Sequence, residues 1–245
     1  MRFILGLWFF AALTVTGVQA DSARDIARIH TEAIGGKTRM DQMTTLRATG
    51  RVLIDGRTMT FQLIAERPNH LRMETQVADK RIIQATDGVA PPWQLNPDAN
   101  PPVVTELSGD EAAEFAADAE FDDPLVDYAA RGYAIDYAGE HTLDGRRVIK
   151  LLVSRRLVTN YFLLLDAETY FIVRKQATRT RSGREVQVET VYDDFRPVAG
   201  VILPHRYAAY ADGHLLHETI LEMVEPNAPV PVDSFSRPIL IAVPK

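Results

Sequence analysis

The sequence contains no cysteine among its 245 residues. This absence excludes a disulfide scaffold, a thiolate nucleophile and every cysteine-ligated zinc or iron–sulfur site. Basic residues are also in deficit, with 27 Lys and Arg against 33 Asp and Glu and a formal net charge of -6. A nucleic-acid binder generally needs a basic face to neutralise phosphates, so we expect no nucleic-acid partner. The hydrophobic fraction of 46% is ordinary for a globular chain.

The N-terminal segment 1–20 has the pattern of a secretory signal peptide. Arg2 precedes a nearly continuous apolar run, and Val18 and Ala20 place small residues at the two positions that signal peptidase reads. The alternative is an uncleaved membrane anchor, but the run is short for a membrane span and ends in polar and small residues. We therefore expect cleavage after Ala20 and a periplasmic mature chain, residues 21–245, that forms a single domain.

The mature chain is predicted to begin with a helix. Residues 21–34 carry Ile and Ala at this spacing and are followed by a Gly-Gly pair, which ends a helix readily. A short helical turn is expected within 38–45, with Met40 and Met43 facing inward.

From residue 46 the apolar period changes to two, which is typical of strands with one buried face. Asp55-Gly56 is a strong hairpin signal, and about five antiparallel strands follow one another up to residue 95. A proline-rich loop at 96–102 precedes a helix opened by Ser108, with Glu111 three residues later. A second short helix is predicted over 125–130. Strands resume at residue 135 and continue to residue 224.

These elements predict a mainly β protein with a helical cover, of the α+β class. The expected strands are long for a sandwich, so we expect a single curved antiparallel sheet of about 11 strands that forms an incomplete β-barrel. An N-terminal helix and a mid-chain helical lid are the elements available to cover its inner face.

The search for catalytic or metal chemistry finds little. No serine lies in a nucleophile elbow, and no glycine-rich loop has a phosphate-binding pattern. His214 and His217, next to Glu218, lie on an expected strand, where residues three apart point to opposite faces and do not easily share an ion. We therefore predict no metal site, no cofactor and no enzymatic activity.

The remaining polar residues of interest have structural interpretations. His30 is expected on the solvated side of the first helix, and His205 is expected to be a hydrogen-bonded strand residue. Asp122-Asp123 is expected to cap the second short helix, and Asp193-Asp194 lies at a strand end. Adjacent carboxylates do not supply the separation across a cleft that general acid–base catalysis needs.

The positive signal is apolar. Aromatic residues of the middle helices face a sheet that offers Met, Phe and Leu. They are either ordinary core or the lining of a cavity that can hold an acyl chain, and the residues alone leave both interpretations open. The candidate cavity residues are Met59, Phe61, Leu63, Met73, Trp93, Phe115, Phe121, Leu125 and Tyr128.

Several short motifs occur in an order that is characteristic of a known family. They are Ile34-Gly35-Gly36, Leu46 to Gly50, Glu66 to Arg72, Asp87-Gly88 to Trp93, Leu143 to Arg146, Tyr161 to Asp166 and Asp193 to Pro204. Together they resemble the outer-membrane lipoprotein-sorting-like proteins, relatives of the periplasmic carrier LolA. The resemblance spans residues 23–238, nearly the whole mature chain.

The resemblance implies a half-open β-barrel with a helical lid and a hydrophobic cavity that takes up acyl chains. It implies a lipid or an acylated lipoprotein as partner, together with inner- and outer-membrane envelope proteins, and we expect a monomer. The arginine that holds the lid closed in LolA has three alternatives in this sequence, which are Arg47, Arg51 and Arg72.

We therefore hypothesise a periplasmic, non-enzymatic carrier or binder of lipid or lipoprotein acyl chains. One alternative is a ligand-sensing or scaffold module of the same fold in the cell envelope. The other is an envelope hydrolase, for which His205 or Asp193-Asp194 would have to lie in a cleft.

Overall fold

The computed structural model describes residues 16–155, 158–181 and 184–239. Most of the expected signal peptide, residues 1–15, lies outside the described residues. The helices of the described part are α1 (Thr16–Ala33), α2 (Lys37–Gln42) and α3 (Gly109–Asp118). None of these helices is long and apolar enough to cross a bilayer.

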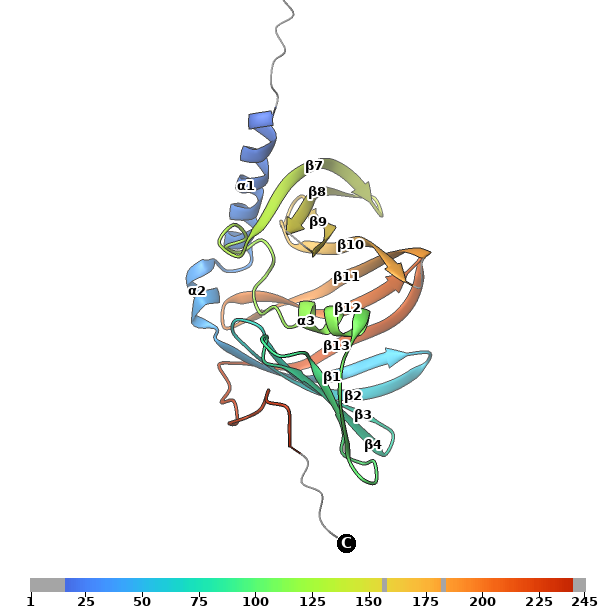
Figure 1. Cartoon of the computed structure of the whole chain (residues 1–245). Coiled ribbons are helices and arrows are strands. Elements are labelled where there is room, and N and C mark those ends of the chain that lie inside the picture. The colour runs from blue at the N-terminus through green and yellow to red at the C-terminus, as the bar shows by residue number, and fades with distance from the viewer. Residues whose placement is uncertain (1–15, 156–157, 182–183, 240–245) are drawn as a thin grey trace, which may run out of the picture.

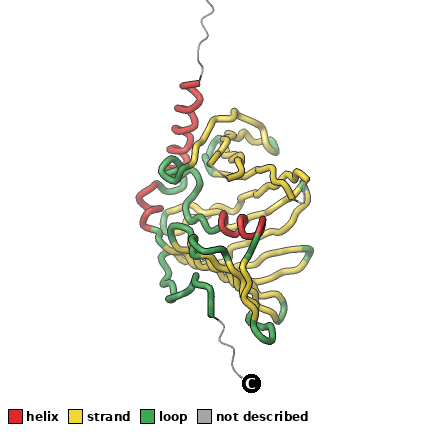
Figure 2. The backbone as a smooth tube through the Cα atoms, viewed as in Figure 1, coloured by secondary structure: helices red, strands yellow, loops and turns green. Residues whose placement is uncertain are grey.

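Strands make up most of the described chain (Figure 2). They are β1 (Thr45–Ile54), β2 (Arg57–Glu66), β3 (His70–Val77), β4 (Lys80–Thr86), β5 (Trp93–Asn96), β6 (Val103–Glu106), β7 (Tyr133–Leu143), β8 (Arg146–Arg155), β9 (Val158–Asp166), β10 (Ile172–Arg181), β11 (Arg184–Val198), β12 (Val201–Ala211) and β13 (His214–Pro226).

All these strands form one antiparallel sheet in the order β6-β5-β4-β3-β2-β1-β13-β12-β11-β10-β9-β8-β7. Pairing of β1 with β13 joins the N-terminal and C-terminal halves. β6 and β7 lie at the two edges, so the sheet is curved but not closed (Figure 1). The predicted incomplete barrel, mainly β with an N-terminal helix and a mid-chain helix, is confirmed. β6 was not predicted; it follows the proline-rich loop and pairs with β5.

Three Asp-Gly pairs form hairpin turns of the sheet, including Asp55-Gly56 as predicted. Asp55 and Gly56 both have positive φ, 49° and 72°. A two-residue turn with this geometry has a twist that matches the right-handed twist of the flanking strands. Positive φ also occurs at Asp144-Gly145 and Asp212-Gly213. The turns therefore determine the register of the meander locally.

Two strands that lie far apart in the sheet contact the same short helix. Phe115 of α3 packs against Leu71 of β3, and Glu114 of α3 pairs with Arg179 of β10 at 3.2 Å. β3 and β10 are six positions apart in the strand order, about 29 Å in a flat sheet. α3 has 10 residues and is about 15 Å long. The sheet therefore wraps around α3 (Figure 1).

Gly50 allows a close approach at the centre of this curved sheet. The pairing of β1 with β13 shifts register between Thr49 and Gly50. A Cβ atom at Gly50 would lie 2.0 Å from the carbonyl oxygen of Ile220 and 3.0 Å from Cε1 of Phe61. Bulges and strand glycines commonly mark such bends.

Each helix covers a different part of the inner face. Ala23, Ile26 and Ala27 of α1 pack with Leu151 of β8 and Leu163 of β9. Residues of α2 and its C-terminal end, Met40 and Met43, are buried against Val198 and Val201, as predicted. α3 covers β3.

The second short helix predicted over 125–130 is wrong, because these residues form turns. Asp127 has a φ of 48°, which is incompatible with a continuing right-handed helix. The guanidinium of Arg131 donates to the carbonyl oxygens of Asp123 at 2.7 Å and Val126 at 3.2 Å. These side-chain bonds satisfy carbonyls that a helix would have paired through its backbone.

The close approach at Gly50 leads to a stability prediction. We expect Gly50→Ala to lower the free energy of unfolding by about 2 kcal/mol, because the new methyl group meets the Ile220 backbone, which has little room to move. The measurement is urea unfolding followed by circular dichroism. Thr60→Ala at an exposed position of β2 is the control, with an expected change within about 0.5 kcal/mol. Equal effects of the two substitutions would contradict the prediction.

Candidate functional site

The register of the strands defines which side chains share the inner face. Met59 of β2 pairs with Val52 of β1, and Val52 pairs with Thr219 of β13. Thr219 pairs with Tyr207 of β12, and Tyr207 pairs with Tyr192 of β11. Directly paired residues point to the same side of a sheet. One continuous row therefore crosses the inner face from β2 to β11.

The N-terminal half of the inner face is apolar. Met59, Phe61, Leu63 and Met73 all lie there, with Phe115 of α3 packed against the last two. Five of the nine candidate cavity residues are thus brought together. Phe61 is buried, but Met59, Leu63 and Met73 are only half-buried. We call the inner-face residues of β1 to β3 the apolar wall, comprising Ala48, Val52, Met59, Phe61, Leu63, Leu71 and Met73.

Three other candidates lie where the mid-chain segment meets α1 and α2. Phe121 packs in the cluster around Met40 and Met43. Leu125 is buried in the α1 cluster, and Tyr128 packs against that cluster. These side chains fasten the segment after α3 to one end of the sheet, away from the apolar wall.

Trp93 lies on the opposite, outer face, which corrects its assignment to the cavity. It pairs with Ala85 and packs with Ile83, and its indole Nε1 donates to the carbonyl oxygen of Phe235 at 3.0 Å. The C-terminal segment therefore covers Trp93. β5 begins at Trp93 itself, and its register with β4 determines the face to which the indole points.

The middle of the inner face is polar. We call Tyr161, Lys175, Tyr192 and Tyr207 the polar wall; their strands β9 to β12 are adjacent. The sequence analysis did not select these residues. Tyr207 packs against the cluster of the apolar wall, so the two walls are continuous. Burial raises the pKa of Tyr207 to about 12 and raises the pKa of Tyr192 as well, although both side chains remain partly accessible.

Arg67, directly after β2, connects the mid-chain segment to the sheet. Its guanidinium pairs with Asp122, donates to the carbonyl oxygens of Met40 at 2.6 Å and Met43 at 2.8 Å, and lies 4.9 Å from the ring centre of Phe121. No sequence expectation named Arg67.

The three arginines that the resemblance offered as lid-holding residues form contacts elsewhere. Arg47 donates to the carbonyl oxygen of Pro229 at 2.8 Å, and Arg51 pairs with Glu222 at 3.4 Å. Arg72 pairs with Glu74 at 2.8 Å. Arg67 therefore holds the segment after α3, whereas these contacts of Arg47, Arg51 and Arg72 lie outside that segment.

Glu120 is a second anchor of the same segment. Its carboxylate pairs with Arg131 at 2.8 Å and with Arg155 at 2.7 Å. It also accepts a hydrogen bond from the hydroxyl of Tyr133 at 2.6 Å. Charge-assisted hydrogen bonds are stronger than neutral ones, so this network ties the segment firmly to β7 and β8.

His30 is the third anchor, and its expected exposure to solvent is wrong. The side chain is 1% exposed. Nδ1 donates to the carbonyl oxygen of Tyr170 at 2.7 Å, and Nε2 lies 3.1 Å from the carboxylate of Asp123. Burial favours the neutral imidazole, but attraction to Asp123 outweighs it and raises the pKa of His30. Burial likewise opposes ionisation of Asp123, yet His30 holds its pKa below the ordinary value.

The other polar candidates form structural contacts. His205 is buried, and its Nδ1 lies 3.0 Å from the carbonyl oxygen of Leu203, in keeping with its expected strand role. Asp193 pairs with Arg206 at 3.3 Å, and Asp194 pairs with Arg196. Within the described ranges, no three His, Asp or Glu side chains gather as a metal site would require.

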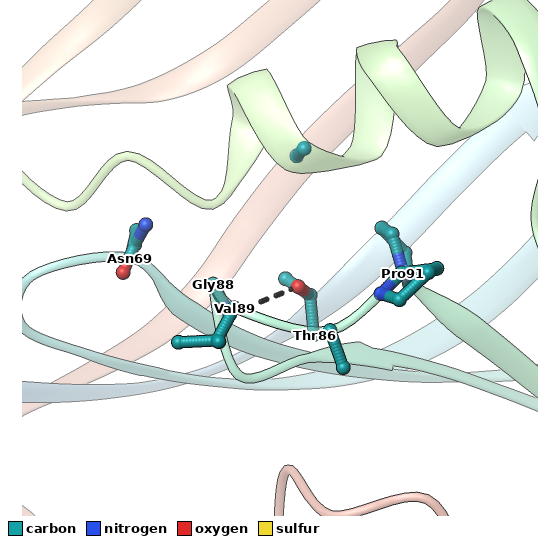
Figure 3. Close-up of a pocket in the computed structure, with 8 residues that line it drawn as sticks. Asn69, Thr86, Gly88, Val89 and Pro91 are labelled. Atoms are coloured by element: carbon teal, nitrogen blue, oxygen red, sulfur yellow. Dashed lines mark hydrogen bonds between the residues drawn. The ribbon is translucent and has the colours of Figure 1, made fainter.

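Two pockets adjoin the mid-chain segment. The pocket in Figure 3 has a volume of about 360 Å³ and lies between Ala116 of α3, the segment from Thr86 to Pro92, and Asn69. The amide of Gly88 donates to Thr86 Oγ1 at 3.1 Å on its rim. A more open groove of about 540 Å³ runs between α1 and the turns at 125–130, with Leu125 and Tyr128 in its lining.

The architecture matches solved structures over most of its length. A domain of the outer-membrane lipoprotein-sorting type from Vibrio parahaemolyticus superimposes with a TM-score of 0.59 at 12% identity, covering 89% of this chain and 97% of that chain. The LolA-type fold is therefore shown. A LolA superfamily protein from Nitrosomonas europaea has a TM-score of 0.55 at 14% identity, with coverages of 90% and 99%.

A DUF1329 family protein from Desulfovibrio piger also superimposes, with a TM-score of 0.59 at 11% identity and coverages of 89% and 97%. No protein-family model and no curated protein matches the sequence itself. The resemblance inferred from the order of motifs is confirmed as a likeness of fold.

The contacts of Arg67 predict a large effect of its removal. We expect Arg67→Gln to destabilise the protein by about 3 kcal/mol, because Asp122 loses its partner while largely buried. Arg51→Gln is the matched control, since the Arg51 pair is about half exposed, and a change below about 0.5 kcal/mol is expected. Chemical unfolding gives both values, and hydrogen exchange should locate the loosening at residues 119–126. A larger effect at Arg51 would overturn the assignment of the anchor.

The His30–Asp123 pair predicts a specific pH dependence. Because the pKa of His30 is raised in the folded state, its contribution is complete below the ordinary value of 6.5 and is lost as the pH rises through the raised value. The lowered pKa of Asp123 removes its contribution only as the pH falls below 3.8. The stability difference between wild type and His30→Gln should therefore shrink as the pH rises above 6.5. Unfolding titrations at several pH values measure it, and a difference that grows with pH would refute the pair.

Proposed function

We propose that this protein is a periplasmic, non-enzymatic carrier or binder of lipid or lipoprotein acyl chains. The observation that carries the proposal is the half-buried state of Met59, Leu63 and Met73, which face the inside of the curved sheet under α3. Inward-facing apolar side chains of a finished core are normally sealed. Accessible apolar surface inside a fold indicates a place for an apolar ligand.

Binding would work by transfer of methylene groups from water to the apolar wall. Each buried methylene contributes roughly 0.8 kcal/mol, so a long chain gains enough to bind without any chemical step. Phe115 of α3 and Ala119, directly after that helix, pack on Leu71 in this region. α3 would have to shift or share the surface with the ligand, which keeps uptake reversible.

The N-terminal segment supports a location in the periplasm. The predicted signal peptide would direct the chain to the envelope and leave a mature domain of residues 21–245. The partners we propose are a lipid or acylated lipoprotein and the membrane proteins that deliver and receive it. One structural neighbour with this fold is named for outer-membrane lipoprotein sorting, which is consistent with this proposal.

Two methionines on opposite faces of the sheet provide a matched test. Met59 belongs to the apolar wall, whereas Met223 pairs with Thr49 on the outer face and is 48% exposed. We expect Met59→Glu to weaken binding of a fluorescent fatty-acid probe by at least about tenfold, because a carboxylate would then lie in the acyl site. Met223→Glu should bind like wild type. Equal binding by all three proteins, with their folds intact, would refute the proposed site.

Mass spectrometry of lipids that co-purify with the mature protein tests the function more broadly. A carrier should retain acyl lipid and release it to acceptor vesicles. Absence of lipid, together with no displacement of the fatty-acid probe, would exclude acyl binding. Retention without transfer would favour a ligand sensor of the same fold.

A further inference from the structure

Lys175 places a cation on the inner face that acyl binding alone does not require. It pairs in register with Leu163 of β9 and Thr190 of β11, so it lies on the same face as the apolar wall. Its ammonium nitrogen lies 4.6 Å from the ring centre of Tyr161. Among the described residues Lys175 forms no ion pair, whereas Arg179 on the same strand pairs with Glu114 at 3.2 Å.

Three tyrosine hydroxyls accompany this cation. Tyr161, Tyr192 and Tyr207 occupy the inner face of strands β9, β11 and β12. The rings of Tyr192 and Tyr207 meet edge to face at 5.7 Å. In the part of the chain that the structure describes, none of the three hydroxyls hydrogen-bonds to another residue, in contrast to Tyr133, whose hydroxyl donates to Glu120 at 2.6 Å. Hydroxyls without protein partners can donate to a ligand.

The surroundings of Lys175 favour an anion. Burial lowers its pKa, and the carboxylates of Asp118 and Glu120 oppose this only in part, while Arg179 adds to it. A buried ammonium that lacks a close counter-ion is poorly solvated, so an incoming anion with hydrogen-bond acceptors stabilises it.

Two of the three carboxylates near Lys175 are paired with arginines. Glu120 is held by Arg131 and Arg155, and Glu114 by Arg179. Asp118 lies at the end of α3, and burial raises its pKa despite attraction to Lys175. Because Asp118 belongs to α3, a shift of that helix would also remove the competing carboxylate from Lys175.

We propose that the inner face binds an amphiphile with an anionic head group, carboxylate or phosphate, whose head lies at Lys175 between the tyrosine hydroxyls. The acyl chain runs over Tyr207 to the apolar wall. Lys175 on β10 is five strand positions from Met59 on β2, about 24 Å along the curved sheet. This inference rests on the proposed acyl-chain function and adds the chemistry of the head group.

The experiment compares ligands that share one hexadecyl chain and differ only in the head. Palmitate and hexadecyl phosphate are anionic, hexadecanol is uncharged and hexadecyltrimethylammonium is cationic. Displacement of a fluorescent fatty-acid probe from the delipidated mature protein is measured for each ligand, at concentrations below the critical micelle concentration of that ligand. We expect the better of the two anionic ligands to bind about tenfold more tightly than hexadecanol. The stronger anion identifies a free fatty acid or a phosphate-bearing lipid as the source.

Variants at Lys175 and Asp118, which carry opposite charges, separate the contribution of the head group to binding from that of the acyl chain. Lys175→Met should remove the advantage of the anionic ligands and leave hexadecanol unchanged. Lys175→Arg should retain the advantage, and Asp118→Asn should increase it. Circular dichroism checks that each variant is folded. If Lys175→Met does not fold, Lys175→Arg and Asp118→Asn carry the comparison, since loss of the Asp118 charge should tighten binding of the anionic ligands, weaken binding of the cationic ligand and leave hexadecanol unchanged.

The outcomes distinguish this inference from the proposed function. If no hexadecyl ligand binds wild type, acyl binding itself is refuted. If all bind equally, or if Lys175→Met weakens hexadecanol as much as palmitate, the acyl site stands and the anionic head site at Lys175 is refuted. Tighter binding of the cationic ligand would refute it as well and would point to Asp118 as the dominant charge.

Discussion

Coverage of the inner face is the constraint on which the structure depends. A sheet of this width has more inward-facing surface than α1, α2 and α3 can cover, so it can be buried only by curving. Contact of α3 with both β3 and β10 shows how far the curvature goes. Even so, Met59 and Met73 remain half-buried. The incompletely covered surface lies where the fold brings apolar and polar walls together, and the proposed ligand site follows from this shortage of cover.

Charge as well as apolar packing holds the segment that follows α3. Asp122 binds Arg67, Asp123 faces His30, and Glu120 binds Arg131 and Arg155. Each of these acids lies within a few residues of the others, but their partners come from the turn after β2, from α1, from the end of the segment and from β8. Breaking one partly buried pair costs more than breaking a surface pair because the remaining charge stays poorly solvated. The segment is therefore a fixed base, in contrast to α3 itself.

The fold could be predicted largely from local patterns, and the site only in part. Period two and the Asp-Gly turns are local signals, and they predicted most of the meander, although β6 was missed and β5 is only Trp93–Asn96. Met59, Phe61, Leu63 and Met73 share a face because alternation places them there. Trp93 and His30 were misplaced because burial of each depends on a distant segment: the carbonyl of Phe235 and the carboxylate of Asp123. Arg67 lay in a quoted motif, but only its contact with Asp122, 55 residues away, reveals its role.

The unequal attachment of the cover determines which part can move when a ligand enters. α3 is held by Phe115, which packs on Leu71, by a partly exposed salt bridge from Glu114 to Arg179, and by a hydrogen bond from Gln84 to Glu111 at 3.2 Å. An acyl chain on the apolar wall can replace those apolar contacts with equivalent ones, so the net cost of displacing α3 is small. No such replacement exists for the ion pairs of Asp122, Asp123 and Glu120. A ligand of the proposed kind should therefore move α3 about a stationary segment, and an anionic head at Lys175 would compensate for the carboxylate of Asp118 that leaves with the helix.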